Sequence, residues 1–206
     1  MNDLDFAGFL VSRVCHDLVG PMGAVVNGLE VLEDETDAAM RADALRIVTQ
    51  SAGQALARLQ FLRIAFGAAG SAGAELDLSE VGRLVNGLLE GGKVRLDWQA
   101  AHVHWPKDWA KLLMNAALVA ADALPRGGDV IVKTAQAGSA PSFLVRASGA
   151  GAKIFAEAEK AVRGETENAG LDARGIQPFL AYRLAERVGT SLSVSASEGA
   201  VEVKAG

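Results

Sequence analysis

The sequence predicts an α+β protein in which an N-terminal antiparallel helical hairpin, dimerising into a four-helix bundle, is followed by an α/β sandwich. Two observations lead to this prediction. In the first third of the chain, apolar residues recur at alternating spacings of three and four, which is typical of helices that pack side by side. After a run of small residues, helical and strand-like segments then alternate, which indicates helices packed on a mixed sheet.

The first helix is expected from an apolar stripe, here called the seam, that ends where acidic residues begin. The acidic stretch 33–37 breaks the pattern, and Thr36 or Asp37 can cap a following helix. The seam of the first helix consists of Val11, Val14 or Cys15, Leu18, Met22, Val25, Leu29 and Leu32.

The second helix carries a matching seam, so that the two helices predict an antiparallel hairpin joined by a short turn. A hairpin alone cannot bury both seams, and two copies would cover them in a four-helix bundle. We therefore expect a homodimer, and the alternative is that the C-terminal half covers the seam. The second seam consists of Leu45, Val48, Ala52, Ala55, Leu59, Leu62 and Phe66.

The second part of the chain follows a linker of small residues at 67–74. We place a hairpin domain at 1–70 and a sandwich domain at 75–206. Helices are expected at 78–89, 107–124 and 177–188, and strands at 94–98, 130–134, 143–147, 192–194 and 201–203.

Composition excludes several classes of function. The 206 residues carry a net charge of −5, which leaves no basic surplus for nucleic-acid binding. Cys15 is the only cysteine, so no intramolecular disulfide can form, and this fits a reducing compartment. The acidic N-terminus does not resemble a signal peptide, and no apolar run approaches the roughly 20 residues of a membrane span. A cytoplasmic location without membrane contact is expected.

His16 is the residue to which the sequence points most directly. A helix turns about 100° per residue, which places His16 about 160° from Leu18 and away from the seam. Gly20 and Gly23 each cost roughly 1 kcal/mol relative to alanine in a helix, and Pro21 removes a helical hydrogen bond. Such residues beside an exposed histidine indicate clearance for a partner. The predicted docking face consists of Phe9, Ser12, Arg13, Gly20, Gly23 and Asn27.

The segment from His16 to Leu32, HDLVGPMGAVVNGLEVL, resembles the phosphoacceptor box of sensor histidine kinases, with an acid next to the histidine and a proline five residues on. The resemblance implies that His16 accepts phosphate and that Asp17 is its acidic neighbour. A neutral imidazole nitrogen is a nucleophile near pH 7, and Asp17 can hold the other ring nitrogen or take its proton. Without the resemblance, Asp17 could equally be a solvated helix acid.

The C-terminal part resembles the ATP-binding domain of the same kinases, with its ligand positions lost. The segment 111–128 looks like the asparagine-box helix, but Val119 stands where the family's magnesium-binding asparagine is expected and cannot ligate a hard cation. The segment 145–151 looks like the first glycine box, with Ala147 in place of its adenine-binding aspartate. The second glycine box aligns with 173–178. Gly175 is the one glycine of the box that remains, and Gln177 occupies the third lost ATP-site position.

Together these features are similar to the ChpT-type histidine phosphotransferases of alphaproteobacterial phosphorelays, over about residues 6–203. The resemblance implies a two-component phosphorelay in which a homodimer carries phosphate from the receiver domain of a hybrid histidine kinase to the receiver domains of response regulators. It implies a degenerate histidine-kinase-type sandwich that binds no cofactor, because the receiver supplies the Mg²⁺. Gly20 lacks the side chain with which related kinases orient a hydrolytic water, so no efficient phosphatase activity is expected.

Two other interpretations of the whole chain stay open at this stage. The protein could be an active sensor-type histidine kinase, or a non-catalytic dimeric adaptor with a vestigial histidine. His102 and His104 would share a face of a strand as two metal ligands can, but no Cys, Asp or Glu accompanies them nearby, so no metal site is predicted. Trp98, Trp105 and Trp109 are expected to pack in the core.

Overall fold

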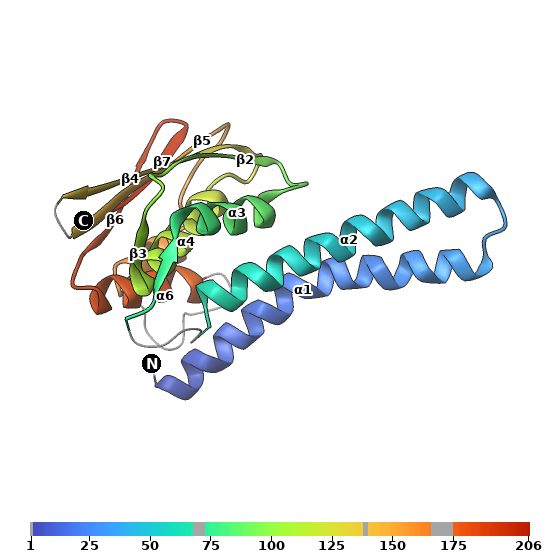
Figure 1. Ribbon diagram of the computed structural model, residues 1–206, viewed down its shortest axis with the longest axis horizontal. Coiled ribbons are helices and arrows are strands. Elements are labelled where there is room, and N and C mark those ends of the chain that lie inside the picture. Colours follow the sequence, from blue (N-terminus) through green and yellow to red (C-terminus); the bar gives the residue numbers. More distant parts are fainter. Residues whose placement is uncertain (1, 68–72, 138–139, 166–174) are drawn as a thin grey trace.

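The computed structural model describes residues 2–67, 73–137, 140–165 and 175–206. The helical hairpin projects away from a sandwich that also holds the C-terminus (Figure 1). Helix α1 spans Asp3–Asp34 and continues through Pro21, and helix α2 spans Ala38–Ala65. Asp37 caps α2 by accepting hydrogen bonds from the backbone N–H groups of Ala39 and Met40, which confirms one of the two caps expected.

A five-stranded mixed sheet forms one layer of the sandwich, in the order β2-β4-β5-β7-β6. Only β2 and β4 are parallel, and the remaining neighbours run antiparallel. A separate pair joins β1 (Glu75–Asp77) to β3 (His104–Pro106). The strands of the large sheet are β2 (Val94–Gln99), β4 (Gly128–Ala137), β5 (Ala140–Ser148), β6 (Leu192–Ser197) and β7 (Ala200–Ala205).

Helices form the second layer, between the sheet and the hairpin (Figure 1). They are α3 (Leu78–Leu89), α4 (Lys107–Asp122), α5 (Ala156–Val162) and α6 (Ile176–Arg187). The predicted helices and strands are confirmed within a few residues. The short elements β1, β3 and α5 were not predicted, because elements of three to seven residues are too short to show a hydrophobic period.

The hairpin and the sandwich share one hydrophobic core. Phe61, Leu62 and Ala65 of α2 are buried in the same cluster as the residues of α4 and the sheet. From α4, the Lys111 ammonium donates to the carbonyl of Gly67, just beyond the end of α2, and burial lowers its pKa. The core therefore crosses the predicted linker, of which residues 68–72, including the proposed domain boundary at 70, lie outside the described residues.

The seam of α1 divides between two faces of the helix. Val14, Leu18, Val25 and Leu32 are half-buried, whereas the other half of the predicted set is exposed. Gly28, which was not in the predicted seam, is buried where α1 meets Val48 of α2. The face of α1 that packs against α2 is therefore rotated from the predicted seam. The exposed members of the seam are Val11, Cys15, Met22 and Leu29.

Cys15, the alternative to Val14 in the predicted seam, is exposed in the single chain and is not a core residue there. Helix α1 is also long and apolar enough to meet a length-and-composition criterion for a membrane span, with a mean hydropathy of 1.3 over its best window. The expectation that no apolar run approaches the length of a membrane span is therefore wrong for α1. The exposed apolar residues of α1 account for this hydropathy, because little of this helix is buried by the rest of the chain.

Candidate functional site

His16 lies on α1 where the hairpin passes the sandwich, and its side chain is 76% exposed. This agrees with the helical arithmetic that placed it away from the seam. Arg58 of α2 donates to the backbone carbonyl of Asp17 at 3.4 Å, which ties this turn of α1 to the second helix. A solvent-accessible imidazole on a well-anchored helical turn can meet a reactive group carried by another protein.

Asp17 faces His16 with one carboxylate oxygen and Arg13 with the other. The distance from His16 Nδ1 to Asp17 Oδ1 is 3.3 Å, and Arg13 Nε donates to Asp17 Oδ2 at 2.9 Å. Because Asp17 lies beside Nδ1, Nε2 is the ring nitrogen left for another partner. Arg13 and Asp17 stand one helical turn apart, the spacing at which side chains of a helix meet.

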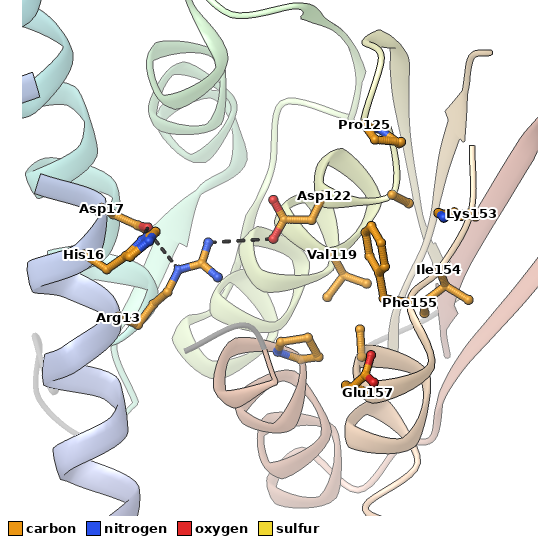
Figure 2. A pocket seen from close by; sticks show the side chains of 13 residues that line it. Arg13, His16, Asp17, Val119, Asp122, Pro125, Lys153, Ile154, Phe155 and Glu157 are labelled. Carbon is orange, nitrogen blue, oxygen red and sulfur yellow. Dashed lines mark hydrogen bonds and ion pairs between the residues drawn. The ribbon is translucent and has the colours of Figure 1, made fainter. Parts of the chain in front are cut away.

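A pocket of about 580 Å³ lies between α1 and the sandwich, beside His16 (Figure 2). Arg13 extends across it from α1 towards Asp122 of α4, with 3.7 Å between Arg13 Nη2 and Asp122 Oδ2. The pocket wall combines residues of the hairpin with residues of α4, α5, α6 and the loop before α5. It is lined by Arg13, His16, Asp17, Val119, Asp122, Ala123, Pro125, Lys153, Ile154, Phe155, Glu157, Ala158 and Pro178.

The three positions assigned to a lost ATP site are all buried. Val119 is on the pocket wall, whereas Ala147 is in the core beneath the helices. Gln177 is fully buried and donates to the backbone carbonyl and the side-chain oxygen of Asn115, at 2.8 and 3.2 Å. Asn115 in turn donates to the carbonyls of Lys111 and Ala65. Gln177 and Asn115 thus bind each other, and Asn115 also binds the end of α2.

The predicted docking face divides into an open and a covered part. Ser12, Gly20, Gly23 and Asn27 are exposed along α1. Phe9 packs against the small cluster of Ala161 and Phe179, and the Arg13 side chain is only 11% exposed. These two residues face the sandwich of the same chain, which the sequence could not reveal. The open part of the face therefore lies on both sides of His16 along α1, and most of it lies towards the hairpin tip.

Sequence reasoning missed the residues that the sandwich contributes to the pocket. Asp122, Lys153, Phe155 and Glu157 are far from His16 in the chain. Asp122 stood within the segment compared with the asparagine box, but no role was assigned to it. No sequence periodicity connects such distant residues. The one local indication was Asp122 itself, an acidic residue at the end of a predicted helix.

His102 and His104 do not form a shared ligand pair. His102 precedes β3, and its Nδ1 lies 2.8 Å from Ser79 Oγ, whereas His104 pairs with Asp77 in the β1–β3 ladder. Among the described residues there is no group of three or more His, Cys, Asp or Glu that could hold a metal ion. Trp105 is fully buried and meets Trp109 edge to face, in agreement with a packing role.

The fold and the site together define a class: a protein of histidine-kinase-like fold, in which a histidine on a helical hairpin lies beside an α/β sandwich. A solved histidine kinase domain from the Erythrobacter litoralis EL346 blue-light activated histidine kinase has the same fold, with a TM-score of 0.52 at 16% identity, covering 89% of this chain and 94% of that one. A solved structure of a bacterial phosphotransferase matches far more closely, with a TM-score of 0.90 at 33% identity, covering 100% of this chain and 98% of that one.

The chain belongs to the histidine phosphotransferase family. The family model for the histidine phosphotransferase C-terminal domain matches residues 78–200. Protein phosphotransferase ChpT of Brucella abortus (strain 2308) is 36% identical over 197 residues, which cover 96% of this chain and 93% of that protein. The expected family is confirmed, and the protein is a phosphotransferase.

Proposed function

We propose that His16 accepts a phosphoryl group from an aspartyl phosphate in the receiver domain of a hybrid histidine kinase and passes it to the receiver domains of response regulators. In acceptance, His16 Nε2 forms a P–N bond while the P–O bond of the acyl phosphate breaks, and the receiver aspartate leaves as a carboxylate. Mg²⁺ bound by the receiver neutralises charge on the phosphoryl group. The reverse step regenerates the imidazole.

The exposure of His16 together with the contact between its Nδ1 and Asp17 is the observation that carries this proposal. A hydrogen bond from Nδ1–H to the Asp17 carboxylate would hold the ring in the tautomer whose Nε2 lone pair is free. The same carboxylate would stabilise the ring as Nε2 gains its bond to phosphorus. The proposed reaction requires no nucleotide, and the buried Gln177 and Val119 are consistent with a chain that binds none.

A transfer assay tests the proposal. The purified protein is incubated with a receiver domain bearing a labelled aspartyl phosphate, with Mg²⁺ present and ATP omitted. We expect the label to appear on the chain in an acid-labile form, as phosphohistidine is. A parallel incubation with labelled ATP alone is expected to leave the chain unlabelled, and strong labelling there would instead identify a histidine kinase.

We also propose that two chains pair through the exposed apolar residues of the hairpin, in the cytoplasm, to form a four-helix bundle. Met22 and Leu29 on α1 and Leu45 and Leu56 on α2 are all large apolar residues about half exposed. A second copy of the same hairpin would cover both helices at once. This is also the simplest account of the high hydropathy of α1.

A charged residue within this apolar surface should break the dimer. The Met22→Glu variant would bury an unpaired carboxylate in the bundle, which costs several kcal/mol. Sedimentation equilibrium is expected to give a dimer for the wild type and mostly monomer for Met22→Glu. Ile131→Glu, a substitution on the sheet far from the hairpin, serves as the control and should stay dimeric. A monomeric wild type would contradict the proposal.

A bulky residue at Gly23 should block the receiver without disturbing the fold. A Cβ built at Gly23 meets nothing within 4 Å, so Gly23→Trp can be accommodated by the chain itself. If the receiver lies against the open part of the docking face, the indole would hold it off the histidine. We expect the transfer rate to fall by at least about tenfold, which corresponds to roughly 1.4 kcal/mol.

The matched control for Gly23 is Gly53 of α2, where a new Cβ also meets nothing within 4 Å. Gly53→Trp introduces the same side chain on the other helix and is expected to transfer at the wild-type rate. Circular dichroism and sedimentation would check that both variants keep their helices and their oligomeric state. Wild-type transfer by Gly23→Trp would remove this face from the proposed receiver contact.

A further inference from the structure

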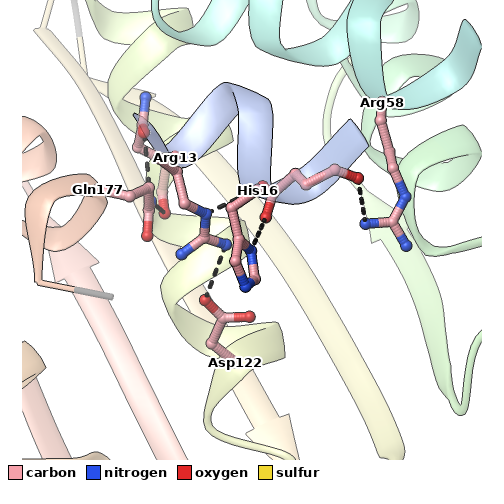
Figure 3. Close-up of polar contacts among 7 residues, drawn as sticks. Arg13, His16, Arg58, Asp122 and Gln177 are labelled. Carbon is pink, nitrogen blue, oxygen red and sulfur yellow. Dashed lines mark hydrogen bonds and ion pairs between the residues drawn. The ribbon is translucent and has the colours of Figure 1, made fainter. Parts of the chain in front are cut away.

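We propose that Asp122, at the end of α4 in the sandwich, is a positioning residue for phosphoryl transfer and acts on His16 through Arg13 and Asp17. The inference rests on the proposed role of His16 as the phosphoacceptor. In Figure 3 the guanidinium of Arg13 lies next to the His16 ring, and a dashed line joins it to Asp122. Through Asp122, the sandwich would take part in the chemistry of the hairpin.

Arg13 is placed between two carboxylates that come from different parts of the molecule. Its Nε donates to Asp17 Oδ2 at 2.9 Å, and its Nη2 stands 3.7 Å from Asp122 Oδ2. The side chains of Arg13 and Asp17 are only 11% and 13% exposed, so water screens their interaction weakly. Asp122 is half exposed and approaches the guanidinium from the sandwich side.

The direction in which Nη2 points decides how many oxygens of Asp17 remain for His16. Arginine and a carboxylate prefer a two-fold pairing, in which two N–H groups meet the two oxygens. Here Nη2 is directed to Asp122, so Arg13 takes only Oδ2 of Asp17, and Oδ1 stays with the imidazole. Without the charge of Asp122, Nη2 can turn to Asp17 Oδ1 and compete with His16 for it.

The contact between Asp17 and His16 is sensitive to this competition. At 3.3 Å it lies beyond the usual length of a hydrogen bond from nitrogen to oxygen, so a small rotation of the carboxylate breaks it. A neutral imidazole that loses the partner of Nδ1 is free to carry its proton on Nε2 instead, and this removes the lone pair that attacks phosphorus. Asp122 thereby keeps the reactive tautomer populated.

The test measures the tautomer of His16 and its transfer kinetics in the same proteins. Full-length protein with ¹⁵N-labelled histidine is compared as wild type, Asp122→Asn and Asp122→Glu, with His16→Ala to assign the signals. We expect the neutral ring of the wild type to carry its proton on Nδ1. Asp122→Asn should give a mixture of both tautomers, and Asp122→Glu, which restores the charge, should return the wild-type spectrum.

The kinetic part separates positioning from direct contact with the receiver. For Asp122→Asn, we expect the single-turnover rate at saturating phosphorylated receiver to fall about tenfold, while the half-saturating receiver concentration stays within about twofold. The double variant Asp17→Asn/Asp122→Asn should be no slower than Asp17→Asn alone, because both changes break one chain of contacts. Asp129→Asn, which breaks an exposed ion pair with Arg95 on the sheet, is the control and should behave as wild type.

Two results would overturn the inference. An unchanged tautomer in Asp122→Asn would do so, as would an unchanged saturating rate. A higher half-saturating concentration at an unchanged saturating rate would make Asp122 a receiver contact instead of a positioning residue. A wild type that takes up no phosphate would refute the proposed function, but the tautomer measurement would still decide whether Asp122 orders the imidazole.

Discussion

The His16→Ala variant is expected to take up no phosphate from a phosphorylated receiver. Alanine removes the imidazole that is the nucleophile of the proposed reaction, so the aspartyl phosphate loses its acceptor and the transfer rate should fall to background. A loss of about 10³-fold or more, beyond 4 kcal/mol of barrier, is the scale expected when a nucleophile is removed. The measurement is the amount of label on the chain after a single turnover with the phosphorylated receiver in excess.

The chain offers its own controls, because it holds only two other histidines. His102→Ala and His104→Ala alter residues of the β1–β3 region, away from the pocket. Both variants should accept phosphate at the wild-type rate. Equal labelling of His16→Ala and the wild type would place the acceptor elsewhere. Binding of the receiver by His16→Ala should persist, since most of the docking face is unchanged.

Replacing Asn115 with leucine should lower the free energy of unfolding by about 2–4 kcal/mol. The asparagine is fully buried and donates to Ala65 O at 3.2 Å and to Lys111 O at 2.9 Å, and its side-chain oxygen accepts from Gln177. Leucine has a similar size but leaves the Ala65 carbonyl and one interaction of Gln177 unsatisfied. Urea denaturation followed by circular dichroism would measure the change.

Asn86→Leu provides the comparison for this stability prediction, because Asn86 lies exposed on α3. The same change of side chain there removes no buried hydrogen bond, and the free energy of unfolding should stay within about 0.5 kcal/mol of the wild type. If the two variants unfold at the same urea concentration, Asn115 does not link the sandwich to the hairpin in the way described.

Hydrophobic period and capping sufficed to predict the long helices and most of the large sheet. The 32-residue α1 and the 16-residue α4 each contain several turns of repeating pattern, and such segments are the most predictable. The short β1 and β3 contain three residues each, so their pairing follows from tertiary contacts and not from any local pattern. The division of the α1 seam into two faces likewise depends on where α2 lies.

The candidate site was predictable only where its residues are neighbours in the chain. His16 and Asp17 follow from a local motif, and the open part of the docking face follows from the turn of the helix. Asp122 and Lys153 reach the same pocket by folding alone, and Arg13, predicted as a partner contact, pairs with acids of its own chain. Charge partners so distant in sequence carry no periodic signal.

The continuous core has a consequence for how the protein can be divided. Phe61 and Leu62 are buried against the sandwich, and Asn115 and Lys111 satisfy carbonyls at the end of α2. A hairpin cut free near residue 66 would uncover these apolar side chains, and a sandwich without it would open its core. We therefore expect the two parts to unfold as one cooperative unit, so that the hairpin carrying His16 could not be grafted intact onto another protein.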